Sequence, residues 1–181
     1  MNIKTYKDRR TVVFFWALPL LIISTLTNCA LEPVPPCPSI RVDTNTSQLI
    51  KYKNNTPSKP ENIAHTAEIL SYEGNCSFSS KGVAVKFDID LLIQLGPKSE
   101  IGALELFYFI AVPQYFPDPN GKNIFVRNHQ ITDKTPRREI IREKNIEVFL
   151  PLENKLRAAA YDIYIGFQLA NHKLEKNRAQ K

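Results

Sequence analysis

Three cysteines are the residues whose number and spacing restrict their chemistry most. Cys29 and Cys37 lie eight positions apart behind an apolar N-terminus, and Cys76 stands alone later in the 181-residue chain. An odd number of cysteines in an exported protein indicates one thiol with a separate role. We expect Cys37 and Cys76 to form a disulfide in an oxidising compartment, which leaves Cys29 for another reaction. Two unbonded thiols are the alternative for Cys37 and Cys76.

The residues before Cys29 predict export. The first ten residues are polar and basic, residues 11–26 carry no charge, and the sequence LTNC follows at residues 26–29. This order is typical of a secretory signal peptide, which we assign to residues 1–28. The alternative is a retained transmembrane helix, but a span of the bilayer needs roughly 20 apolar residues.

The LTNC sequence resembles a bacterial lipobox, although Asn28 stands where that motif has a smaller residue. The resemblance implies that Cys29 carries a diacylglyceryl group and a palmitate-type chain on its amine, and that it becomes the first residue of the mature chain. Ala30, rather than Asp, then implies an outer-membrane lipoprotein facing the periplasm. Residues 29–36 contain three prolines and predict a short extended tether. An alternative interpretation is a eukaryotic secreted domain that is glycosylated at Asn45, Asn54 and Asn75. The lipobox-like sequence argues against this alternative.

The other chemically active residues do not form a recognisable catalytic motif. His65, His129 and His172 are far apart in the sequence, and no CxxC, GxSxG, HExxH or phosphate-binding glycine loop is present. We therefore expect no metal, no cofactor and no enzymatic activity. An enzyme or small-ligand carrier with a pocket between two sheets is the alternative, because distant residues can assemble a site on such a fold.

Two charged groups are candidate contact sites. Asp88 and Asp90 lie two positions apart on one predicted strand and could share a cation, although a solvated strand face is the favoured interpretation. The segment 135–145 could bind lipid phosphates or an acidic partner, but its own glutamates favour a salt-bridged edge. Its basic residues are Arg137, Arg138, Arg142 and Lys144.

An aromatic pair is the third candidate. Tyr115 and Phe116 lie between Pro113 and Pro117, where they could form an exposed contact patch or close one end of the domain. Nucleic acid is not an expected partner, because the residues from Cys29 onward include 20 basic and 17 acidic side chains. The expected partners are a membrane, through the lipid anchor, and another protein of the cell envelope.

Alternating apolar residues predict the elements that must position these groups. The alternation is clearest over residues 82–96 and recurs over 146–152 and 161–169, with weaker strands at 39–43 and 48–52. Residues 101–116 are apolar on both faces, which predicts a strand covered on both sides, and a turn at 117–121 leads into a strand at 123–131. We expect an all-β domain over residues 37–170, an antiparallel β-sandwich of the immunoglobulin or fibronectin kind. Residues 171–181 predict a short C-terminal helix.

Four stretches together resemble an uncharacterised family of small alphaproteobacterial lipoproteins. They are CPSIRV, GNCSF, FYFIAVPQY and the closing YDIYIGFQL with its NR tail. The resemblance implies export, acylation and a β-rich domain. It implies no catalytic residue.

Overall fold

The computed structural model describes residues 34–53 and 59–179, and the residues from Pro35 onward form one compact unit. The expected signal peptide and the lipid-attachment residue Cys29 lie outside the described residues. In the part of the chain that the structure describes, no helix is long and apolar enough to span a bilayer.

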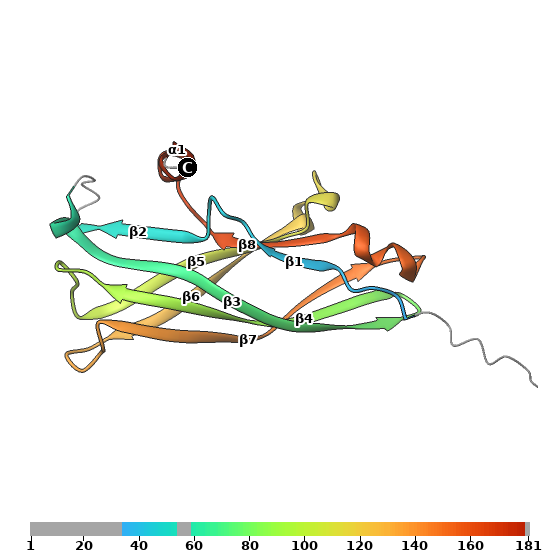
Figure 1. The fold of residues 1–181 in the computed structure, drawn as a ribbon, viewed down its shortest axis with the longest axis horizontal. Helices are drawn as coiled ribbons and strands as arrows, with labels where there is room; N and C mark the ends of the chain where they lie inside the picture. Colours follow the sequence, from blue (N-terminus) through green and yellow to red (C-terminus); the bar gives the residue numbers. More distant parts are fainter. Residues whose placement is uncertain (1–33, 54–58, 180–181) are drawn as a thin grey trace, which may run out of the picture. The chain divides into compact units, whose positions relative to one another are not determined.

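Two four-stranded sheets make up this unit, as expected for an all-β sandwich (Figure 1). The β5 sheet contains, in spatial order, β1 (Ser39–Val42), β8 (Asp162–Phe167), β5 (Gly102–Ala111) and β6 (Lys122–Ile131). The β4 sheet contains β2 (Gln48–Tyr52), β3 (Ile63–Ser79), β4 (Gly82–Leu95) and β7 (Arg138–Pro151). All pairings are antiparallel except that of β1 with β8. The adjacency of β2, β3 and β4 in one sheet is a feature that the sequence did not predict.

The core lies between the sheets and is built from the alternating residues of β4, β5, β7 and β8. Every second residue of β4 from Val83 to Ile93 is at most 2% exposed. From the facing sheet, Leu106, Ile163, Ile165 and Phe167 are completely buried. This burial confirms the predicted apolar faces of residues 82–96 and 161–169. Burying such side chains stabilises the fold by about 1.5–3 kcal/mol each.

Strand β3 was not expected, although it is the longest strand. Its inward residues are Ala67 and Ile69 before Leu70, and Tyr72 and Gly74 after it, because Leu70 is an extra residue in the pairing with β4. Such a β-bulge shifts the alternation by one position. A search for residues alternating with period two therefore finds no single strand in this segment.

The prediction for β5 was correct in place but wrong in burial. The strand pairs with β6 and β8, so it is central in its sheet at one end, yet only its inward face is covered. Leu104, Leu106 and Ile110 are buried, whereas Phe107 is 43% exposed on the outer face. The apolar residues on the outer face of β5 are therefore not covered by a second layer of the fold.

Short 3-10 helices and one α-helix complete the fold. The 3-10 helices are η4 (Pro60–Asn62), η5 (Pro113–Tyr115), η6 (Pro119–Gly121) and η7 (Lys155–Ala160). The expected C-terminal helix is α1 (Asn171–Ala179), which lies beside β2 (Figure 1). Leu174 of α1 packs against the core, and the Asn177 side chain donates a hydrogen bond to the Asn45 carbonyl oxygen. The C-terminal segment is thus attached to the sandwich.

Candidate functional site

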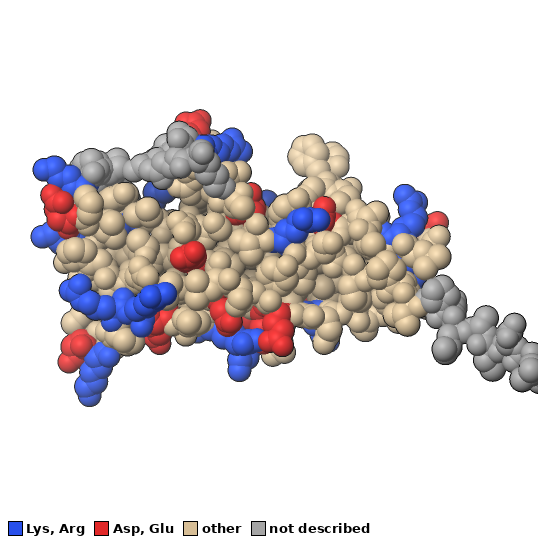
Figure 2. Space-filling view, in the orientation of Figure 1, with Lys and Arg blue, Asp and Glu red and all other residues tan. Residues whose placement is uncertain are grey.

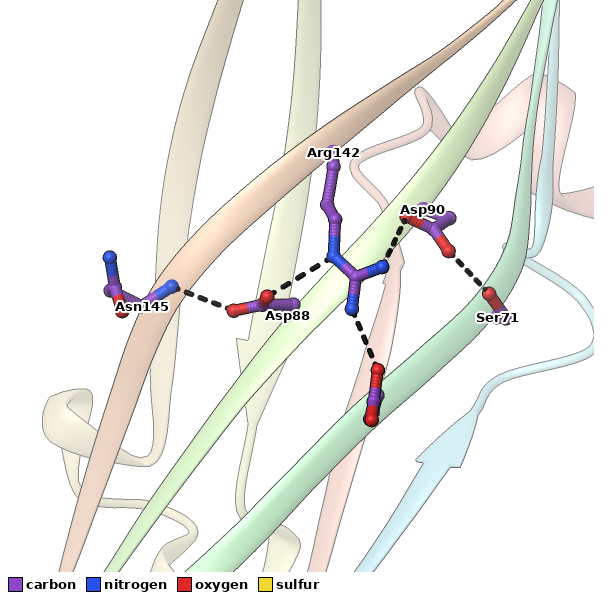
Figure 3. Close-up of polar contacts among 6 residues, drawn as sticks. Ser71, Asp88, Asp90, Arg142 and Asn145 are labelled. Carbon is purple, nitrogen blue, oxygen red and sulfur yellow. Dashed lines mark hydrogen bonds and ion pairs between the residues drawn. The ribbon is translucent and has the colours of Figure 1, made fainter.

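Arg142 of β7 binds carboxylates from two other strands on the outer face of the β4 sheet (Figure 3). Its Nε lies 3.1 Å from Asp88 Oδ2, its Nη2 lies 2.9 Å from Glu73 Oε2, and its Nη1 lies 3.7 Å from Asp90 Oδ1. One residue of the predicted basic segment therefore meets both residues of the predicted carboxylate pair. Glu73 is the member that the sequence did not reveal.

A second β-bulge places Arg142 and Asp88 together. Lys144 and Asn145 of β7 lie opposite Asp88 of β4, because the register shifts between Phe87 and Ile89. Asn145 has a positive φ of 59°, a conformation that asparagine tolerates better than most residues. Its backbone N–H donates a 2.9 Å hydrogen bond to Asp88 Oδ1. The bulge thus supplies a donor to the same carboxylate that Arg142 binds.

The contacts favour the charged forms of Asp88 and Arg142. The Asn145 N–H, and then Arg142, lower the pKa of the Asp88 carboxyl, while hydrogen bonds to Glu73 and Asp88 raise the pKa of Arg142. Asp90 also accepts a 2.9 Å hydrogen bond from Ser71 Oγ (Figure 3). Asp88 and Asp90 therefore serve as partners of an arginine. No group of metal-binding side chains is present among the described residues.

Among the described residues, the other basic residues of segment 135–145 form no ion pair with this network, although the charge of Lys144 also lowers the pKa of Asp88. Arg137 precedes β7, and Arg138 is its exposed first residue, opposite Gln94. On the face in Figure 2, acidic and basic side chains lie next to each other rather than in separate fields. The prediction that the glutamates of segment 135–145 neutralise its arginines is wrong for Arg142, whose partners are carboxylates of β3 and β4.

Edge strands β6 and β7 direct further charges inward, between the two sheets. Arg127 Nε lies 3.1 Å from Glu143 Oε1, at an angle outside that of a hydrogen bond, and His129 Nε2 lies 3.3 Å from Glu139 Oε2. The Tyr108 hydroxyl donates to Glu143 Oε2 at 3.4 Å, and burial and that carboxylate raise the pKa of Tyr108. Inward charges of this kind protect open sheet edges from pairing with other chains. The prediction of a solvated edge is therefore wrong for Glu139 and Glu143, whose side chains project between the sheets.

Tyr115 and Phe116 have different roles in the structure. Tyr115 packs against the core, 5.7 Å from the ring of Tyr161, and burial raises the pKa of its hydroxyl. Phe116 is 85% exposed. Tyr115 therefore helps to close this end of the sandwich, and only Phe116 remains available for contact.

Cys37 and Cys76 meet at disulfide distance, as the sequence predicts, with their Cα atoms 5.9 Å apart. Cys37 lies two residues before β1, and Cys76 lies near the end of β3. The bridge therefore connects the two sheets at the point where the described chain enters the domain.

A groove opens between β2 of one sheet and β5 of the other. Two adjoining cavities of about 430 and 300 Å³ share Lys51, His65, Ala103 and Leu104 in their walls. Lys173 of α1 lines the larger cavity, and Lys98 lines the smaller one. We call this feature the β2–β5 groove. No local pattern of residues predicts this groove, because its walls come from strands whose register and length are set by the whole fold.

Comparison with known proteins leaves the chain without an assigned relative. No family model, curated protein or solved structure matches it.

Proposed function

We propose that this protein is a non-enzymatic lipoprotein of the bacterial cell envelope whose sandwich domain binds another envelope component. The acyl chains on Cys29 hold it to a membrane. Ala30, the residue that follows the cysteine, favours the outer membrane. Residues 29–36 separate the domain from the bilayer.

The pairing of Cys37 with Cys76 is the observation that carries this proposal. It accounts for two of the three cysteines, so Cys29 is the odd thiol, and it lies at the end of the lipobox-like sequence. A disulfide also suits an oxidising compartment such as the periplasm. The resemblance to small alphaproteobacterial lipoproteins points in the same direction.

A binding role fits the described domain better than catalysis. The charged side chains on β3, β4, β6 and β7 neutralise one another, as structural ion pairs do. The β2–β5 groove, in contrast, brings together side chains whose charges are not neutralised, which is a property of a surface that receives a partner.

Metabolic labelling tests the anchor directly. The full chain is expressed in a diderm bacterium with an alkyne analogue of palmitate, alongside Cys29→Ser and the matched control Cys76→Ser. We expect the wild type and Cys76→Ser to carry the label and sediment with membranes, and Cys29→Ser to lose the label. Equal labelling of wild type and Cys29→Ser would overturn the lipoprotein assignment.

A further inference from the structure

Strand β8 runs antiparallel to β5 and ends before it reaches the first residues of β5. This leaves an open strand position beside the N-terminal half of β5. The last paired residues are Phe167 of β8 and Tyr108 of β5, after which the chain turns into α1. Within the described chain, the segment from Gly102 to Leu106 pairs only with β6. The position beside this segment is part of the β2–β5 groove, since Ala103, Glu105 and Phe107 line its larger cavity.

The backbone of β5 directs hydrogen-bonding groups into this open position. The Gln168 N–H donates to the Phe107 carbonyl oxygen at 2.8 Å, so Phe107 faces the β8 side of the strand. In an antiparallel strand, alternate residues present their N–H and C=O groups to the same side. Ala103 and Glu105 therefore face the groove. An open edge of this kind is a template for an added strand.

The opposite wall of the groove carries basic side chains. Lys51 of β2 lies directly opposite His65 of β3 in the register, so both side chains project from the same face of the β4 sheet. That face is the inward one, because Ala67, two residues after His65, is buried in the core. Lys173 of α1 completes this wall, and Leu49 and Leu104 supply apolar surface beneath it.

These basic groups lack a neutralising partner in the described structure. Lys53 pairs with Glu100 at 2.5 Å, but Lys51, Lys98 and Lys173 form no ion pair with a described carboxylate. Burial and the charges of Lys51 and Lys173 lower the pKa of His65 to about 4, so His65 is neutral near pH 7. Burial and Lys51 also lower the pKa of Lys173. With Glu100 and Glu105 as its only described acids, the groove has an excess of positive charge.

We propose that the β2–β5 groove binds an extended, acidic segment of a partner protein, which adds to β5 as a strand in place of the missing continuation of β8. The main chain of the segment bonds to Ala103 and Glu105, and its carboxylates lie against Lys51, Lys98 and Lys173. A second copy of this chain is a poor occupant, because the residues from Cys29 onward, with 20 basic and 17 acidic side chains, carry a net positive charge that opposes the lysines. This inference rests on the proposed binding role but is independent of the lipid anchor.

Peptide selection with a hydrogen-exchange readout tests the proposal. A random ten-residue display library is selected on the full chain in detergent micelles, and the enriched peptides are synthesised. We expect sequences that combine β-branched residues with Asp or Glu. In the free protein, the Ala103 and Glu105 amides should exchange rapidly, and bound peptide should slow both by about tenfold or more, since exchange reports local opening. The Leu104 and Leu106 amides, which face β6, serve as internal references.

Variants separate strand addition from simple charge attraction. Ala103→Pro removes an N–H that faces the groove and should weaken peptide binding about tenfold or more, whereas Ala103→Val keeps the donor and should bind like the wild type. Lys51→Glu with Lys173→Glu should weaken binding at least as much, and the same charge change at exposed Lys134 and Lys155 should not. The lysine variants keep the test valid if Ala103→Pro fails to fold.

Three results would overturn the proposal. They are the absence of enriched peptides, enriched peptides without acidic residues, and binding that survives both groove variants. Peptide binding is measured without reference to acylation. A chain that binds peptide but takes no label would therefore refute the anchor alone.

Discussion

Asp88 accepts hydrogen bonds from two donors of different kinds, the backbone N–H of Asn145 and the guanidinium of Arg142. The backbone donor depends on the bulge in β7, so the carboxylate and the bulge support each other. Arg142 in turn separates Asp88 from Glu73 and Asp90. Without this cation, three carboxylates on adjacent strands would face one another.

We therefore expect Arg142→Gln to lower the melting temperature by a few degrees at low salt, and less at high salt, because screening weakens repulsion between exposed charges. Arg138→Gln, at the exposed start of the same strand, is the matched control and should melt like the wild type. Neutralising Arg137, Arg138 and Lys144 in addition to Arg142 should lower the melting temperature little more than replacing Arg142 alone. An unfolded quadruple variant would show that the segment contributes more than its surface position indicates.

His65 makes stability depend on pH. Its pKa falls from the ordinary 6.5 to about 4 in the folded protein, mainly through burial. As the pH drops from 6.5 to 4, the unfolded chain therefore takes up a proton that the folded chain does not, and stability is lost. The whole shift corresponds to about 3.4 kcal/mol. Because the His65 side chain is only half-buried, we expect a loss of roughly 2–3 kcal/mol.

Urea unfolding at a series of pH values checks this expectation. The wild type should lose stability between pH 6.5 and 4, and His65→Gln should not. Asp88 acts in a separate window, because its lowered pKa stabilises the fold above its ordinary 3.8 and loses that effect only at lower pH. A His65→Gln profile that parallels the wild type would assign the acid sensitivity to other groups.

At the scale of elements, the bulges in β3 and β7 determine which strands could be predicted from the sequence. Strands β4 and β8 keep one alternation throughout, so their inward residues could be predicted. In β7 the inward residues are Glu139, Ile141 and Glu143 before the bulge and Ile146 after it. The sequence predicts the second half correctly, but it predicts a salt-bridged edge for the first half, because a pattern of period two changes face at each bulge.

The candidate sites follow the same rule. The Cys37–Cys76 pair could be predicted from the odd number of cysteines together with the place of Cys29 in the lipobox-like sequence. The contact of Arg142 with Asp88 depends on the register between β4 and β7, which no local pattern specifies. The β2–β5 groove depends on where β8 turns away from β5, and Gln168 carries no signal for that exit.

The disulfide joins two elements of unequal strength, the four-residue β1 and the long β3–β4 hairpin. It closes a loop with a sequence separation of 39, and bridges of this kind stabilise proteins by about 2–4 kcal/mol. Reduction should lower the urea midpoint accordingly and increase hydrogen exchange in β1. The β4 amides should remain protected, because the core of β4, β5 and β8 does not include the bridge.

Cys37→Ser with Cys76→Ser should reproduce the reduced protein and should not respond to reductant. Rapid alkylation of both thiols in the native, unreduced protein would contradict the pairing.

For the whole molecule, the two flanks of the sandwich are closed in different ways. Arg127, His129, Glu139 and Glu143 close the flank between β6 and β7 with inward charges. On the other flank, α1 covers the start of β2, and the groove stays open beside β5. The molecule therefore protects one pair of edges and leaves one strand position accessible.

Replacing Glu139 and Glu143 by valine should convert the protected flank into an apolar edge. We expect the variant to form dimers or larger assemblies, because inward charges on edge strands oppose association. Light scattering across a concentration series measures this, with Glu147→Val on the outer face of β7 as the control. A double variant that stays monomeric would show that these glutamates do not prevent association and only contact residues between the sheets.

The place of the disulfide also decides how the domain carries mechanical load. A pull on the chain before Pro35 reaches Cys37 first, and the bridge passes the force to Cys76 on β3. From there the force runs into β3, which is paired with β4 over most of its length. Without the bridge, the same pull would act on β1 and detach its four residues from β8. The bridge thus turns a weak point of attachment into one that withstands tension.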